Sequence, residues 1–165
     1  MDDKGRRSRL RPKTPGSAVE VTAQAMYAAL VKDVLSPGFR ELGLKGSGGR
    51  YALASPGVWA LMSLQKSAYS DATEIRFTVN LLAANKEAWD AARAERPYLP
   101  ERPAAGVVYG EPTAWARIGT VTPERADKWW RIHAGVDQAV VAAEVLHDVR
   151  EFALPWLREQ LRDRG

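Results

Sequence analysis

The chain has 165 residues, of which 45% are hydrophobic and 27% charged, a length and balance typical of one globular domain with a buried core. It contains no cysteine, which excludes disulfides, thiolate metal sites and cysteine nucleophiles. No apolar stretch approaches the roughly 20 residues that a membrane helix needs, and the N-terminus lacks the apolar segment of a signal peptide, so we expect a cytoplasmic protein without membrane contact.

The net charge of +4 comes from an N-terminal tail, residues 1–16. This tail holds six of the 24 Lys and Arg residues and two of the 20 Asp and Glu residues, which leaves 18 of each sign in the rest of the chain. Arginine, proline and glycine without hydrophobic periodicity predict a disordered tail. Such a basic arm either contacts nucleic acid phosphates or only improves solubility, and elsewhere the neutral balance argues against nucleic acid.

The first predicted element is a helix. Apolar residues recur at helical spacing after Thr22, which is predicted as the N-cap, and Gly43 is predicted to end the helix. Ser36-Pro37 is expected to break or kink the helix, because proline lacks the N–H that continues the hydrogen-bond ladder. The glycine-rich segment 45–50 could present N–H groups to a phosphate, but phosphate loops run from strand to helix, so a plain turn is expected here.

Five strands are predicted next, at residues 51–54, 58–66, 74–83, 115–121 and 127–132, with a hairpin turn at 55–57. The third strand alternates clearly. Ile75, Phe77, Val79 and Leu81 lie on one face, and Glu74, Arg76, Thr78 and Asn80 lie on the other. One face of the sheet is therefore expected to be buried and the other to meet something polar.

Three further segments complete the prediction. A helix capped by Asn85 ends before Pro97, and residues 97–112, with four prolines, form a long irregular connection of the kind that is often functional or mobile. One more helix starts at Asp137, and a last one runs from Pro155 to about Arg162. Hairpin-joined strands between helices predict a single α+β domain over residues 17–165, an antiparallel sheet of about five strands with helices mainly on one face.

Catalytic and metal-binding patterns are not recognisable in the sequence. The two histidines, His133 and His147, match no ligand-pair spacing, and the acids form no obvious pair. Phosphate-loop, kinase and hydrolase signatures are missing. We therefore expect neither a metal nor a cofactor.

The polar face of the predicted sheet is the main candidate site. Its members come from four strands: Trp59, Ser63 and Gln65; Arg76, Thr78 and Asn80; Trp115 and Arg117; and Trp129 with Arg131. Aromatic walls with a few hydrogen-bonding groups are typical of ligand sites and of protein hot spots. Trp and Arg also shield faces that bind nothing, and the pattern alone does not separate the two readings.

The stretch SLQKSAYS, residues 63–70, forms the rim of this face. Gln65 can hydrogen-bond with Asn80 across the ladder, and Ser67 shares their side if the strand extends that far. Lys66 has the opposite parity and is expected to reach around the sheet edge. Tyr69, Ser70 and Asp71 are expected to make the turn into the third strand.

The ordered segments LGLKGSGGRY, LQKSAYSDATEIRFTVNLL, WARIGTV, DKWWRI and FALPWLREQL resemble the bacterial DUF4304 family, whose function is unknown. The resemblance covers roughly Ala23 to Leu161. The matching motif positions are Gln65, Lys66, Ser67, Asn80, Arg117, Trp129 and Trp130. The family implies no reaction, cofactor or catalytic residue.

These patterns together favour a non-catalytic binding protein, whose sheet face holds a protein partner or a small ligand, with a homodimer as a further option. The expected binding residues are Trp59, Gln65, Lys66, Ser67, Arg76, Asn80, Trp115, Arg117 and Trp129. One alternative is a small-molecule enzyme with Lys66 as base, Arg76 or Arg117 as anion clamp, and Ser67 or Tyr69 as hydrogen-bond donor. A weaker alternative is nucleic-acid contact through residues 1–16.

Overall fold

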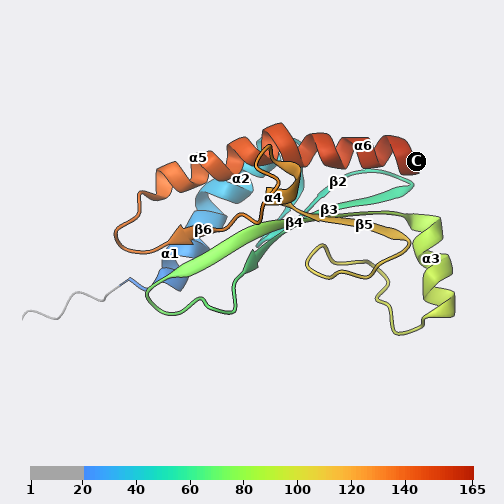
Figure 1. Ribbon diagram of the computed structural model, residues 1–165, viewed down its shortest axis with the longest axis horizontal. Coiled ribbons are helices and arrows are strands. Elements are labelled where there is room, and N and C mark those ends of the chain that lie inside the picture. The colour runs from blue at the N-terminus through green and yellow to red at the C-terminus, as the bar shows by residue number, and fades with distance from the viewer. Residues whose placement is uncertain (1–20) are drawn as a thin grey trace, which may run out of the picture.

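The structure, a computed structural model, describes residues 21–165, so the predicted basic tail lies outside the described residues. The described chain forms an antiparallel sheet with helices, which confirms the predicted α+β class (Figure 1). The strands are β1 (Lys45–Ser47), β2 (Arg50–Leu53), β3 (Val58–Lys66), β4 (Ile75–Asn85), β5 (Thr113–Arg117) and β6 (Trp130–Ile132). The helical elements are α1 (Ala23–Leu30), η1 (Val31–Leu35), α2 (Ser36–Glu41), α3 (Lys86–Glu95), α4 (Ile118–Val121), α5 (Gln138–Asp148), η2 (Val149–Ala153) and α6 (Leu154–Arg164). Within this part of the chain, every helix is too short or too polar to span a bilayer.

The long strand β4 organises the sheet. Strands β1 to β5 lie side by side in sequence order, and β6 pairs with β4. Both β5 and β6 use the edge of β4 that faces away from β3: β5 pairs with residues 80–84 and β6 with residues 75–77. Segments distant in sequence therefore meet along one strand, which positions the candidate site.

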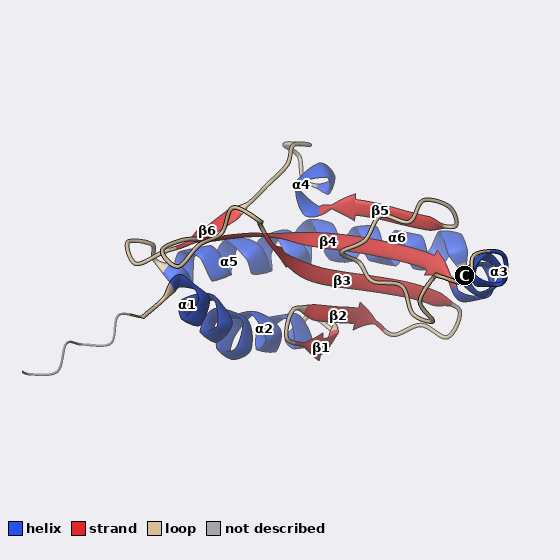
Figure 2. Ribbon diagram, turned by 90° about the horizontal axis from the view of Figure 1, so that it is seen from below, coloured by secondary structure: helices blue, strands red, loops and turns tan. Residues whose placement is uncertain are grey.

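One face of the sheet carries the main core. The α1–α2 and α5–α6 helical segments cover this face, as Figures 1 and 2 show, which confirms that the helices pack mainly on one side. The predicted alternation of β4 is correct here, because its core-facing side chains are 0–1% exposed: Ile75, Phe77, Val79 and Leu81. We call the opposite side of the sheet the outer face.

Local capping signals account for the helix starts. The side chains of Thr22, Asn85 and Asp137 accept hydrogen bonds from the backbone N–H groups of Ala25, Ala88 and Ala139, respectively. An extended backbone residue with a short polar side chain satisfies one of the N–H groups that a helix leaves unpaired at its start. The predicted N-caps Thr22 and Asn85 are therefore confirmed, and Asp137, predicted as the start of its helix, proves to be an N-cap as well.

Pro37 and Pro155 do not break the helices, so the break that was one of the two outcomes expected at Ser36-Pro37 does not occur. The π-helical turn η1 ends just before Pro37, and the N–H of Ser36 reaches back five residues to the carbonyl of Val31. The same arrangement joins α5 to α6, where the π-helical turn η2 precedes Pro155. In both places the wider π turn changes the hydrogen-bond register ahead of the proline, so one helical segment continues into the next.

One turn prediction and two strand predictions need correction. Residues 45–50, expected as a plain turn, form the β1–β2 hairpin around Gly48 and Gly49. The strand predicted at 115–121 ends at Arg117 and continues as α4, where the hydroxyls of Thr120 and Thr122 close local turns on the carbonyls of Arg117 and Gly119. The strand predicted at 127–132 is only Trp130–Ile132.

Candidate binding face of the sheet

The strand register places the predicted polar residues together on the outer face. Ser63, Asn80 and Arg117 form one row across β3, β4 and β5. Gln65 stands opposite Thr78 in the next row, and Arg76 stands opposite Arg131 of β6. Residues of the same parity share a face of a sheet, so these side chains all lie away from the helices.

The half of the outer face near α3 is covered, and so is not the polar surface that the sequence suggested. The connection between α3 and β5, residues 96–112, crosses it, as Figure 2 shows. Between this connection and the sheet lies a second hydrophobic cluster of buried residues: Leu61, Leu82, Ala84 and, from the connection, Ala105, with Trp59, Tyr109 and Trp115 packed against them. Leu82 and Ala84, at alternate positions of β4, are apolar, so covering them with the connection removes apolar surface from water.

Trp59 and Trp115 belong to this covered half. The indole N–H of Trp115 donates to the carbonyl of Ala105 at 2.8 Å. Lys86 lies 4.4 Å and Arg102 5.2 Å from the centre of the Trp59 ring, distances at which a cation is attracted to an aromatic face. Both tryptophans therefore hold the connection in place rather than standing open to solvent.

The other half of the outer face is open and is centred on Arg117. Its guanidinium carbon lies 5.7 Å from the centre of the Trp115 ring and 5.1 Å from that of Trp129. Its Nη1 donates to the carboxylate of Asp127 at 3.3 Å, and the same carboxylate accepts the indole N–H of Trp129 at 2.8 Å. The two tryptophan rings and the Asp127 carboxylate thus hold the planar guanidinium in place. A guanidinium binds carboxylates and carbonyls through two parallel N–H groups.

Asn80 of β4 supports the side chains of Arg117 and Gln65 through hydrogen bonds. Its side chain is fully buried, and its Nδ2 donates to Oε1 of Gln65 at 2.6 Å, which confirms the contact expected across the ladder. Its Oδ1 accepts from Nε of Arg117 at 3.4 Å. Thr78, also buried, donates to the carbonyl of Lys128 at 2.7 Å. Asn80 and Thr78 are therefore satisfied within the chain, and Asn80 positions the half-buried side chains of Gln65 and Arg117.

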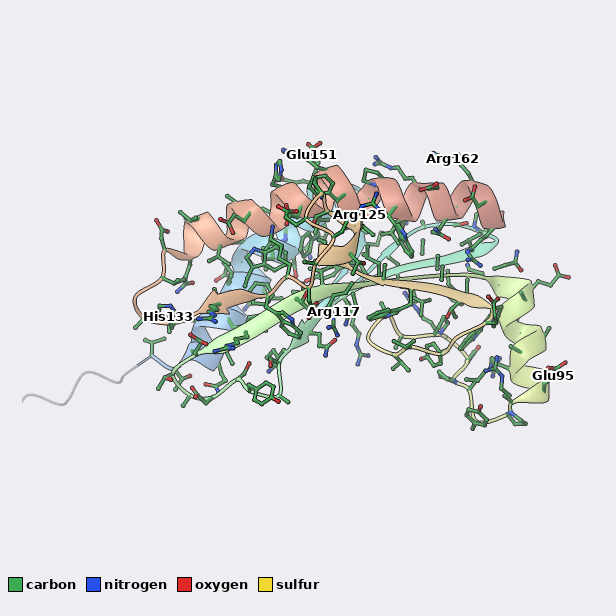
Figure 3. All side chains as sticks on the ribbon, viewed as in Figure 1. Glu95, Arg117, Arg125, His133, Glu151 and Arg162 are labelled. Carbon is green, nitrogen blue, oxygen red and sulfur yellow. The ribbon has the colours of Figure 1, made fainter. Side chains whose placement is uncertain are left out.

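Arg76 forms one rim of the open half. Its Nε donates to Glu74 at 2.7 Å, and the hydrogen bond from Arg76 together with the nearby charges of Arg131 and His133 lowers the pKa of Glu74. The Arg76 side chain remains 42% exposed. Figure 3 labels Arg117 on the side of the sheet away from α5 and α6, with His133 near the far end of the sheet.

Lys66 and Ser67 do not join this cluster. Lys66 stands opposite Phe77 and therefore lies on the helix side of the sheet, exposed at the end of β3, with its Nζ 5.8 Å from the Tyr27 ring. Ser67 shapes the turn, since its hydroxyl accepts the N–H of Tyr69 at 3.1 Å. Lys66 therefore does not share one pocket with Arg76 and Arg117, as the enzyme alternative requires.

Two contributors to the site were missed from the sequence. Asp127, which joins Arg117 to Trp129, lies within the DKWWRI segment but was not singled out. The connection 96–112 was recognised as irregular, but nothing local showed which surface it covers. Among residues 21–165, no group of three or more His, Asp or Glu side chains comes close enough together to hold a metal ion.

The chain is thus a single-sheet α+β protein with helices on one face and a half-covered, aromatic and polar outer face. A family model for DUF4304, a domain of unknown function, matches residues 35–159, and the chain belongs to this family. The matched region begins at Leu35, later than the resemblance at Ala23 suggested, and ends close to the predicted limit. Comparisons with curated proteins and with solved structures gave no match.

Proposed function

We propose that this protein is a non-catalytic binding module that holds a protein partner or a small ligand on the open half of its outer face. The observation that carries the proposal is the fixed Arg117 guanidinium, held by Trp115, Trp129 and Asp127. Its Nε and Nη1 are engaged, whereas within residues 21–165 its Nη2 donates to no protein atom. A held guanidinium with a spare donor binds a carbonyl or carboxylate at low entropic cost.

The surroundings of Arg117 support binding rather than turnover. Gln65, half-buried beside it, adds an amide that Asn80 orients, and the Trp129 ring adds apolar area. Buried aromatic residues and arginines supply most of the energy at protein interfaces. The one base that sequence reasoning favoured, Lys66, lies on the other face of the sheet.

We place this module in the bacterial cytoplasm. The resemblance to a bacterial family and the cysteine-free sequence support this setting, since cysteine-free chains tolerate a reducing compartment.

The test compares three immobilised proteins: the wild type, Arg117→Ala, and Arg158→Ala as a control that removes the same charge from the exposed surface of α6. Native mass spectrometry of each purified protein records retained molecules and dimers, and quantitative capture from a bacterial lysate records protein partners. We expect a species that the wild type and the control bind, with Arg117→Ala weakening its affinity about 30-fold, the loss typical of a hot-spot arginine. The proposal is contradicted if no bound species distinguishes Arg117→Ala from the wild type and the control.

A further inference from the structure

A concave site lies on the helix side of the sheet, away from the outer face. It is a pocket of about 690 Å³ between the α1–α2 helical segment and the β1–β2 hairpin with the end of β3. Small-molecule sites commonly have volumes of about 300–1,000 Å³. Figure 2 shows α2 beside this hairpin, so the pocket joins the opening helical segment to one side of the sheet.

The charged groups of this pocket are all cations. Lys32, Arg40 and Lys66 line it, and none of its lining residues is an Asp or Glu. Among the described residues, no carboxylate lies within ion-pairing distance, 4.0 Å, of these three side chains. Like charges that share a concave site without a counter-charge give it a positive potential, which a bound anion neutralises.

The walls of the pocket are tied together. Nη1 of Arg40 donates to the carbonyl of Gly46 at 3.1 Å, which links α2 to the hairpin. Ser36, which also lines the pocket, shares a buried hydrogen bond with the Tyr51 hydroxyl, and the N–H of Gly49 donates to the same hydroxyl at 3.2 Å. Helix, strand and turn are therefore fixed relative to one another, and a preformed site costs little to organise on binding.

The pocket also has apolar lining. Tyr27, Ala28, Val31 and Leu64 line it beside the cations. Burial and the neighbouring Tyr51 raise the pKa of Tyr27, so its hydroxyl stays protonated and can donate a hydrogen bond. Apolar surface beside cations suits a ligand with an apolar body and an anionic head, and a bare inorganic ion would leave the apolar part of the pocket unfilled.

We infer that this pocket binds a small organic anion, a carboxylate or a phosphate ester with an apolar body, whose head is held by Lys32, Arg40 and Lys66. The site is independent of Arg117, because the two lie on opposite faces of the sheet. It also gives Lys66, which does not join the outer face, a part in ligand binding.

The experiment is isothermal titration calorimetry at low ionic strength with benzoate, phenyl phosphate and benzyl alcohol, which share a ring and differ in charge. The variant Lys32→Gln/Lys66→Gln removes two exposed cations. Its matched control, Arg158→Gln/Arg162→Gln, removes two exposed cations from α6, where Figure 3 labels Arg162. Arg117→Ala separates this site from the outer face.

We expect at least one anionic probe to bind the wild type, the control and Arg117→Ala alike, and to bind the pocket variant at least about tenfold more weakly. Tighter binding of phenyl phosphate identifies a phosphate ester as the ligand class, and tighter binding of benzoate identifies a carboxylate. The inference is overturned if neither anion binds at millimolar concentration, if benzyl alcohol binds as tightly as the anions, or if the pocket variant binds unchanged.

Discussion

Replacing Leu82 by Ala tests whether the 96–112 connection makes part of the outer face a true core. Leu82 is 0% exposed and belongs to the cluster beneath this connection, whereas Arg76, on the same face of the same strand, has a side chain that is 42% exposed. Both positions lie on β4 and on the outer face, but only position 82 is covered by the connection. Leu82→Ala and Arg76→Ala therefore form a matched pair.

The expected loss follows from burial. Truncating a fully buried leucine removes its transfer free energy and leaves a cavity, which together cost about 2–5 kcal/mol. The connection can relax into part of the space, so we expect about 3 kcal/mol for Leu82→Ala. A domain of this size loses about 2–4 °C in melting temperature per kcal/mol, so the melting temperature should fall by roughly 6–12 °C. Arg76→Ala should change the free energy of unfolding by less than about 0.5 kcal/mol, as at most surface sites.

The assay is urea unfolding followed by circular dichroism, with tryptophan fluorescence as a second probe. Both probes should give the same shift in the urea midpoint. The m-value, the slope of the unfolding free energy against urea concentration, should stay constant if the transition remains two-state. A loss below about 1 kcal/mol for Leu82→Ala, or equal losses for the two variants, would refute the view that the connection buries this half of the outer face.

Two further predictions concern local geometry. Gly46→Ala should destabilise the β1–β2 hairpin by about 3 kcal/mol in the same unfolding assay, because a Cβ at this φ of 125° would lie 2.2 Å from the carbonyl oxygen of Arg50. Gly57→Ala, in open space, should cost almost nothing, and similar losses for both glycines would contradict this reasoning. Thr73→Val should raise the pKa of Asp71 toward its ordinary value of about 3.9, because the Thr73 hydroxyl, at 2.7 Å, is the main cause that lowers it. The lowered pKa stabilises the folded state above the ordinary pKa, and this contribution disappears as the pH falls through the lowered value. A carboxyl NMR titration measures the change, with Thr73→Ser expected to keep the pKa low, and an unmoved pKa in Thr73→Val would rule out the hydroxyl as the cause.

The sequence determined the features that depend on neighbours along the chain. The period of two in β4 separates Ile75 and Phe77 from Arg76 correctly, because alternation is a property of any extended backbone. The cap at Asn85 and the helix start at Asp137 could be read directly, since an N-cap contacts only the next turn of its own helix. The family resemblance also came from short ordered motifs, and the family model bears it out.

Only the tertiary structure decided which parts of that pattern are available for binding. Asn80 and Thr78 have the parity of surface residues, yet they are fully buried, because Gln65, Arg117 and the backbone of Lys128 come to them from other segments. Likewise, the cations of the helix-side pocket come from η1, α2 and β3. Contacts between segments distant in sequence do not change the hydrophobic periodicity of either segment. The open half of the outer face and the cationic pocket are therefore visible only in the folded chain.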